Sequence, residues 1–323
     1  MHALAAAHGV ELTDFGKTVW FELWPGIQAP PDATNTWLLS ETGDGFAVKP
    51  VLLSDVPIGL FRAAQRHRDS LLRECKLLVL SGRHLPGVPA RDLEAAEDAN
   101  GLIARAVLDE IEAAVQADPS LTHATVQVSL PEACVDSVRV LGSTLETANV
   151  AAQQATFLTR PALPEIRAFR NWLIEQIVTQ LGGGPITSWG AQAPHATPGE
   201  SVSARVTPVD RSGPVIVAGD DNVILGAGDG IEALLGWPPS ALIGRRIVAI
   251  IPPRLHLQHA TGFTNFLLTG ASRIIGSPVV VAALHRDGHE VPVQLLLGVE
   301  QSQDGRPLFV ATLAPAQVEG ALS

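Results

Sequence analysis

The last third of the chain, residues 214–315, alternates short apolar runs with turn signals. Five runs rich in β-branched residues are typical of strands, and they cover residues 214–218, 222–226, 279–285, 291–299 and 307–312. Asp-Gly dipeptides at 287–288 and 304–305 separate the last three runs, and this dipeptide is a strong hairpin signal. Between the second and third runs, glycines interrupt helical stretches. The order predicts two strands, three helices and three further strands in one antiparallel sheet.

The same segment resembles a PAS sensor domain. The resemblance is carried by five phrases in a fixed order, namely GIEALLGW (230–237), LIGRR (242–246), IPP (251–253), IIG (274–276) and HRDGHEVPV (285–293). For residues 213–316 it implies a five-stranded antiparallel sheet with short helices, curved around a central pocket. Because a fold does not determine a function, the candidate site needs its own argument.

Residues 54–189 show four long amphipathic patterns, which begin near Pro57, Arg91, Pro131 and Pro164. They predict a four-helix-bundle-like domain, so the whole chain is expected to be an α+β multidomain protein. The region resembles an uncharacterised helical module of actinobacterial regulators, through PIGLFRAAQRH (57–67) and RNWLIEQ (170–176). Arg66, His67 and Arg68 are expected on a solvated helix face, as are Arg245 and Arg246. Residues 190–212, rich in Gly, Pro, Ser and Ala, are expected to form a flexible linker.

At the N-terminus, residues 1–25 predict a short helix over 3–10 and a strand over 17–23. The phrase GKTVWFEL (16–23) resembles the C-terminal end of an anti-sigma-factor-type ATPase domain of the histidine-kinase-like fold. The boxes that hold ATP in that family are absent here, so ATP binding is not expected. Residues 26–53 are interpreted as a linker and 317–323 as a tail.

Charge and cysteine content narrow the function classes. Lys and Arg number 22 against 33 Asp and Glu, a formal net charge of −11, which argues against nucleic acid as a partner. No apolar run reaches the length of a membrane span, so no membrane is expected. Cys75 and Cys134 lie far apart without a pairing motif, which favours a reducing compartment. The sequence therefore predicts a soluble cytoplasmic protein.

The helix predicted near residues 255–270 supplies the candidate binding residues. Helical spacing places His259, Phe263 and Phe266 on one face. Light-sensing flavin adducts need a nearby cysteine, and residues 213–323 contain none. The whole chain also lacks tyrosine. A flavin photoadduct is therefore not expected.

The helix also resembles the haem-binding helix of PAS domains in oxygen-sensing nitrogen-fixation kinases. Counting back from the IIG phrase places the iron-ligating histidine of that family at His259, which implies a haem iron ligand there. Further apolar residues would line the gas-binding face, namely Ile274, Leu295 and Leu297. However, Asn265 and Val279 stand where that family has arginines.

Three functions remain open from the sequence. The first is a non-catalytic signalling protein, in which the PAS domain senses a small ligand or forms a homodimer through the strand near 291–297. Its helical domain would then relay the signal to a protein partner. The second is a haem-based gas or redox sensor with His259 as axial ligand. The third is a truncated anti-sigma-type serine kinase, if translation begins upstream.

Overall fold

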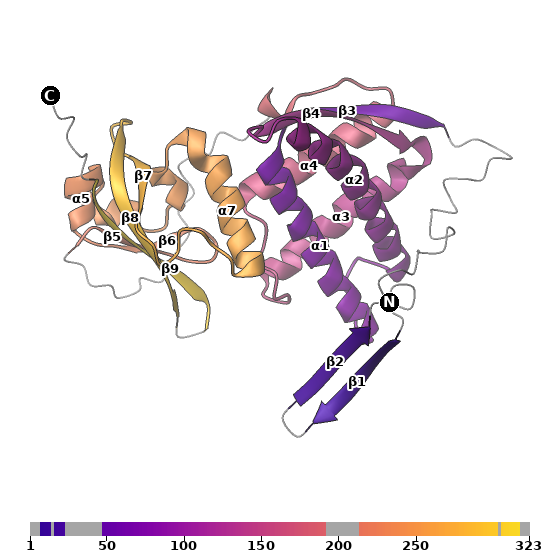
Figure 1. Cartoon of the computed structure of the whole chain (residues 1–323), viewed down its shortest axis with the longest axis horizontal. Coiled ribbons are helices and arrows are strands. Elements are labelled where there is room, and N and C mark those ends of the chain that lie inside the picture. The colour runs from indigo at the N-terminus through magenta and orange to yellow at the C-terminus, as the bar shows by residue number, and fades with distance from the viewer. Residues whose placement is uncertain (1–6, 14–15, 23–46, 192–212, 303–304, 317–323) are drawn as a thin grey trace. The chain divides into compact units, whose positions relative to one another are not determined.

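The computed structural model describes residues 7–13, 16–22, 47–191, 213–302 and 305–316 (Figure 1). The chain divides into two compact units, Met1–Ala47 and Val48–Ser323. The second unit holds a helical domain followed by a domain built on a five-stranded sheet. Among the described residues, no helix combines the length and apolarity needed to cross a membrane.

The N-terminal unit contains an antiparallel pair, β1 (Ala7–Thr13) and β2 (Gly16–Glu22). The strand predicted over 17–23 is confirmed in β2, but the helix predicted over 3–10 is wrong where the structure describes it, because residues 7–10 belong to β1. An isolated helix of eight residues is unstable in water, whereas pairing along the full length of β2 satisfies the backbone of β1.

A second two-stranded sheet opens the helical domain. Strand β3 (Val48–Pro57) pairs antiparallel with β4 (His123–Pro131). Buried and exposed residues alternate strictly along β4 from His123 to Leu130, so one face of that strand is turned to the core. The predicted linker over 26–53 is therefore wrong at 48–53, which are strand; most of its remainder, 26–46, lies outside the described residues.

Four helices follow the predicted patterns closely. They are α1 (Ile58–Leu80), α2 (Ala90–Ala117), α3 (Val135–Gln153) and α4 (Pro164–Leu181). Proline at the first position of α4 suits a helix start, since its missing N–H has no intrahelical acceptor there. The four-helix bundle itself is not confirmed, because β3 and β4 belong to the same core and make the domain mixed.

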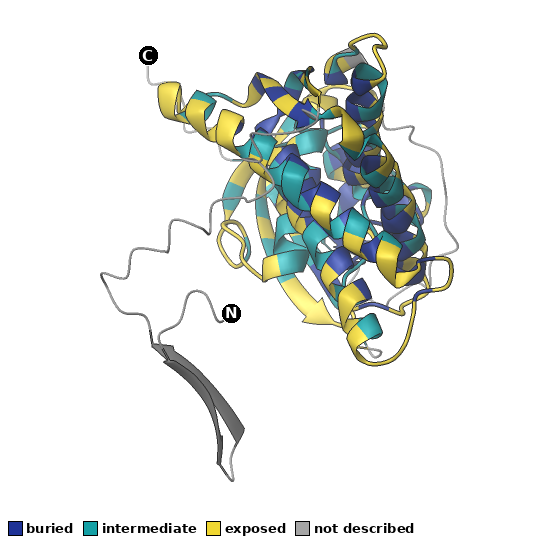
Figure 2. Ribbon diagram, turned by 90° about the vertical axis from the view of Figure 1, so that its right-hand side faces the viewer, coloured by how far each residue is buried: buried dark blue, intermediate teal, exposed yellow. Residues whose placement is uncertain are grey.

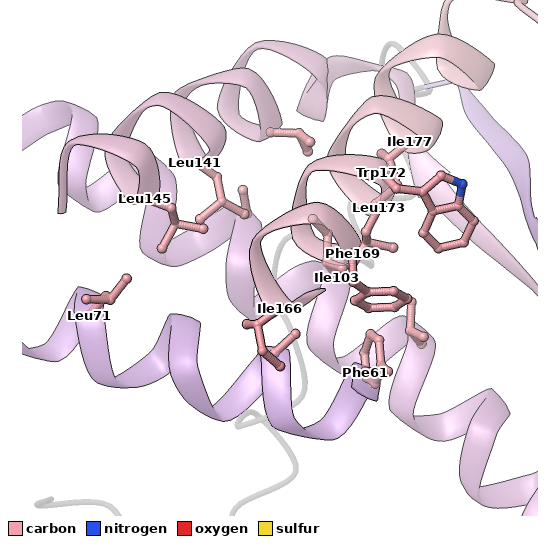
Figure 3. Packing of buried hydrophobic residues seen from close by; sticks show 14 of the residues in the cluster. Phe61, Leu71, Ile103, Leu141, Leu145, Ile166, Phe169, Trp172, Leu173 and Ile177 are labelled. Atoms are coloured by element: carbon pink, nitrogen blue, oxygen red, sulfur yellow. The ribbon is translucent and has the colours of Figure 1, made fainter. Parts of the chain in front are cut away.

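Aromatic side chains form the centre of this core (Figure 3). The Phe169 ring centroid lies 6.3 Å from that of Phe61, 5.5 Å from Trp172 and 5.2 Å from Trp189. The ring planes meet at steep angles in the Phe61 and Trp189 pairs, which is the edge-to-face arrangement that aromatic quadrupoles favour. Buried and exposed residues alternate along the helices, as their amphipathic patterns predict (Figure 2).

The C-terminal domain contains the predicted antiparallel sheet. Its strands are β5 (Val215–Ala218), β6 (Ile224–Ala227), β7 (Val279–Leu284), β8 (Glu290–Gln301) and β9 (Pro307–Pro315). They are ordered β6-β5-β9-β8-β7, so β5, the first strand of this domain, pairs with β9, its last strand. Both the five strands and their antiparallel pairing are confirmed.

Three helices separate β6 from β7, as predicted. They are α5 (Gly230–Leu235), α6 (Pro239–Leu242) and α7 (His256–Thr269). Gly236 and Gly270 end α5 and α7 with φ of 70° and 69°, a left-handed conformation that glycine adopts without a steric penalty. One face of the sheet shares a compact apolar core with α5 and α6, which includes Ile216, Ile224, Ile231, Leu235, Leu242 and Val293.

Candidate functional site

Helix α7 belongs to the C-terminal domain, yet it packs into the core of the helical domain. Ala260 is fully buried within the hydrophobic core of the helical domain, and Leu257 and Phe263 pack against that core. Gly59, near the start of α1, permits this approach. A Cβ atom at position 59 would lie 3.3 Å from Cγ2 of Thr261, tighter than ordinary van der Waals contact. The two domains therefore meet at α7.

The same helix also contacts the sheet of its own domain. The ring centroid of Phe309, on β9, lies 4.8 Å from that of Phe263 and 5.5 Å from that of Phe266. These distances are within the range of favourable aromatic contacts. Helix α7 thus joins β9 on one side to the core of the helical domain on the other.

A bidentate ion pair borders this apolar contact. Nη1 and Nη2 of Arg246, just before a 3₁₀ turn of the C-terminal domain, donate to the two carboxylate oxygens of Glu165 at 3.0 and 2.9 Å. Glu165 is in the first turn of α4, where the helix dipole favours a negative charge. The side chains of Glu165 and Arg246 are 5% and 22% exposed. Such a shielded pair is specific in geometry, because both charges must be compensated.

A second polar contact links the loop after α3 to the β5–β6 turn. Nε of Arg160 lies 2.8 Å from Oδ2 of Asp220, which is buried. Burial raises the pKa of Asp220, and the charge of Arg160 opposes that effect. The carbonyl oxygen of Arg160 is 2.8 Å from Nε2 of His67 on α1. His67 therefore positions the residue that pairs with Asp220.

The prediction that His67 and Arg68 face solvent is wrong, because both are buried. Burial lowers the pKa of His67 to about 4, so its imidazole is neutral near pH 7. Nε of Arg68 donates to Oδ1 of Asn100 at 3.1 Å, and Nδ2 of Asn100 donates to Asp69 at 2.7 Å. The polar residues of α1 face α2 and the loop after α3, because these elements supply their hydrogen-bond partners. Arg66, by contrast, is exposed as predicted, and it donates to Oδ1 of Asn265 at 3.0 Å.

His259, the predicted haem ligand, is partly buried and hydrogen-bonded. Its Nε2 lies 3.0 Å from Oδ1 of Asn222, and its ring stacks on Phe263 with centroids 5.8 Å apart. Burial lowers the pKa of His259 to about 4, and the nearby Glu165 carboxylate opposes this shift. The ring is therefore neutral and donates from Nε2. An iron atom would have to compete with Asn222 for that nitrogen.

The predicted pocket residues are only partly gathered in space. His259 and Phe263 stack, and Phe263 and Phe266 share Phe309. Leu295 packs instead against the core of the sheet domain, and Ile274 is 40% exposed on the segment before β7.

The sequence reasoning missed residues that make the contact between domains. Phe309 had an available signal, since it is an apolar residue in a predicted strand. Glu165 and Asp220 had none, because an acidic residue in a helix start or a turn is ordinary. Arg246 was expected on a solvated face, but the structure places it against Glu165, where it is only partly exposed.

No family model matches the chain. An uncharacterized protein of Azorhizobium caulinodans is 35% identical over 98 residues, which are 30% of this chain and 13% of that protein. The matched region is thus a small part of the Azorhizobium protein.

Several solved structures that are similar to this chain are described as PAS domains. One from Desulfitobacterium hafniense covers 32% of this chain and 93% of its own, at 10% identity and a TM-score of 0.28. The PAS domain of an HTR-like protein from Haloarcula marismortui covers 32% and 79%, at 21% identity and a TM-score of 0.25. The N-terminal domain of a Marinobacter aquaeolei diguanylate cyclase with PAS/PAC sensor covers 31% and 92%, at 20% identity and a TM-score of 0.23. The five-stranded antiparallel sheet, with its helices between the second and third strands, agrees with what the PAS resemblance implies.

Proposed function

We propose that this chain is a non-catalytic signalling protein in which the C-terminal domain acts as the sensor. That domain changes state when it binds a small ligand or dimerises, and α7 passes the change to the helical domain. The helical domain in turn binds a protein partner. A ligand drives such a switch only if it binds one state more tightly than the other. The two states must therefore differ in the contacts that they make with the ligand.

The observation that carries the proposal is the double role of α7. Ala260 is fully buried in the helical-domain core, while Phe266 contacts Phe309 of the sheet. A shift of β9 therefore moves side chains that also support the other domain. Packed cores do not deform continuously, so the side chains at the contact repack and the displacement reaches the helical domain.

Hydrogen–deuterium exchange on the full chain tests the relay. Phe309→Ala removes the aromatic contact with α7, and we expect faster amide exchange in α1 as well as in the sheet. The control is Leu313→Ala, also on β9, because Leu313 belongs to the core of the sheet domain. It should loosen the sheet and leave α1 unchanged. The relay is refuted if Phe309→Ala affects amides of the C-terminal domain alone.

We propose the outer face of the sheet as the surface for dimerisation with a second copy of this chain. Val280 and Leu296 are 68% and 46% exposed on this face. Val280 pairs with Gln294, two residues before Leu296, so the two apolar side chains share a side of the sheet. A two-fold axis would bring this apolar patch against itself, without needing a complementary charge.

Analytical ultracentrifugation tests this dimer. Leu296→Asp should shift the protein to monomer, because each interface would bury an unpaired carboxylate. The control is Leu158→Asp, at an equally apolar and more exposed position of the helical domain. A wild-type protein that sediments as a monomer at all concentrations would rule out the interface.

A further inference from the structure

The turn between β7 and β8 gathers two histidines and an aspartate. Nδ1 of His285 lies 2.9 Å from Oδ1 of Asp287, and Nδ1 of His289 lies 2.5 Å from the same oxygen. The two imidazole rings stack with their centroids 4.4 Å apart. One potential ligand atom from each residue lies within 4.8 Å of the others. Three groups that favour divalent metal ions thus converge on one point of the surface.

The separations are close to those of a metal site. Zinc binds imidazole nitrogen and carboxylate oxygen at about 2.0–2.2 Å, which places neighbouring ligands of a tetrahedron about 3.3 Å apart. The two nitrogen–oxygen distances need to open by less than about 1 Å to reach this value, which side-chain rotation provides. A bound metal would take the place of the contacts between the two imidazoles and the carboxylate, and any proton on a ligating nitrogen would be released.

The backbone holds these ligands in place before any metal arrives. The amide of His285 donates to the carbonyl of His289 at 2.9 Å, which closes the hairpin, and Gly288 has φ of 99°. The ring of His285 also lies so close to Gly236 that a Cβ there would be 2.5 Å from Nε2 of His285. The amide of Arg286 donates to the carbonyl of Leu235 at 2.9 Å. The turn is therefore fixed against the end of α5, and a rigid support reduces the entropic cost of binding.

The charges around the turn suit a cation. The carboxylate of Asp287 is 63% exposed and accepts a hydrogen bond from the amide of His289 at 3.3 Å, which supports a negative charge. The guanidinium of Arg286 stacks over Trp237, 5.8 Å from its ring centroid, and Arg254 pairs with Glu290. The nearby basic side chains thus have other partners.

We propose that His285, Asp287 and His289 form a binding site for a divalent transition metal ion such as Zn²⁺. Three protein ligands leave the fourth tetrahedral position to water or to an incoming ligand, because the site is open to solvent. The mixture of imidazole and carboxylate suits zinc, copper or nickel better than calcium or magnesium. A bound ion would fasten β7 to β8 next to α5. This site does not depend on a relay through α7, so either can fail while the other holds.

Isothermal titration of the tag-free full chain with ZnCl₂, after EDTA treatment, tests the site. We expect one zinc ion per chain. His289→Ala and Asp287→Ala should each weaken binding by at least about tenfold, because the loss of a ligand costs no less than the loss of its supporting partner. Both residues are well exposed, so these variants should fold normally. Substitution with Co²⁺ should give the visible absorption of a tetrahedral site.

The matched control is His84→Ala, which removes an exposed histidine from the helical domain. The stoichiometry and affinity with which this variant binds zinc should equal those of the wild type. The proposal is overturned if the wild type shows no single-site binding. It is equally overturned if His289→Ala and Asp287→Ala bind zinc as tightly as His84→Ala does.

Discussion

The ion pair between Glu165 and Arg246 offers a quantitative test of how the two domains meet. The pair joins the first turn of α4 to the C-terminal domain through two hydrogen bonds of 3.0 and 2.9 Å. Glutamine at position 165 keeps the size of the glutamate side chain and removes its charge, whereas glutamine at position 246 removes the charge of the arginine and also shortens the side chain. A double-mutant cycle with Glu165→Gln, Arg246→Gln and the double variant isolates the interaction energy.

The exposure of the two side chains sets the expected size. Removing one partner from a fully buried pair costs about 3–5 kcal/mol, whereas exposed pairs contribute about 0–1 kcal/mol. Glu165 is 5% exposed and Arg246 is 22% exposed, so the pair lies between these limits. We expect Arg246→Gln to cost about 2 kcal/mol, since it strands a shielded carboxylate that only the helix dipole still stabilises. Glu165→Gln should cost about 1 kcal/mol, because Arg246 keeps some access to water.

Urea denaturation followed by far-UV circular dichroism and tryptophan fluorescence measures these free energies, and a two-state fit holds where the two transitions coincide. The coupling energy should be about 1 kcal/mol or more. The control cycle uses Asp136 and Arg139, whose side chains are 92% and 60% exposed, and its coupling should stay below about 0.5 kcal/mol. Equal couplings in the two cycles would refute the docked arrangement of the domains.

Two further predictions concern α1. Burial lowers the pKa of His67 from 6.5 to about 4, so below pH 6.5 the unfolded chain binds a proton that the folded chain excludes. The neutral His67 should therefore lower the unfolding free energy by up to about 3 kcal/mol between pH 6.5 and 4. His259, whose pKa burial also lowers to about 4, should add a similar fall, so His67→Gln should reduce the slope in urea titrations without abolishing it. Gly59→Val should separate α1 from α7 and cost about 1–3 kcal/mol, with faster amide exchange in α7. Its control, Gly101→Ala, adds a methyl group to α2 where nothing lies within 4 Å, and should be neutral or stabilising; equal losses in both variants would contradict the close contact.

The sheet of the C-terminal domain could be predicted because its signals are local. An Asp-Gly dipeptide determines where a hairpin turns, whatever lies around it. Strand β4 was missed although its residues alternate, since it lies between two long helical patterns. Strand β3 was harder still. It contains Pro50 and bends at a register shift between Leu53 and Val56, and Asp55 there has φ of 61°.

The contact between domains could not be predicted, because it depends on which surfaces meet. The run Arg66-His67-Arg68 looks solvated on any single helix. Only the packing of α1 against α2 and the loop after α3 buries the last two residues. Likewise, nothing near Arg246 in the sequence indicates Glu165, which lies 81 residues away. Local sequence patterns predict each helix or strand, but which elements pack against each other is determined only in the assembled fold.

The composition of the α7 contact suggests how it can both hold and switch. Apolar packing around Ala260 stabilises the contact but does not fix the relative position of the two surfaces, because the hydrophobic effect depends only on the area removed from water. The pair of Arg246 with Glu165 fixes that position, because its two hydrogen bonds are lost when the surfaces slide past each other. If the C-terminal domain slid along the helical domain, the contact would lose little apolar area, but the pair of Arg246 with Glu165 would break. That asymmetry favours two discrete arrangements of the domains over a continuum, as the proposed relay requires.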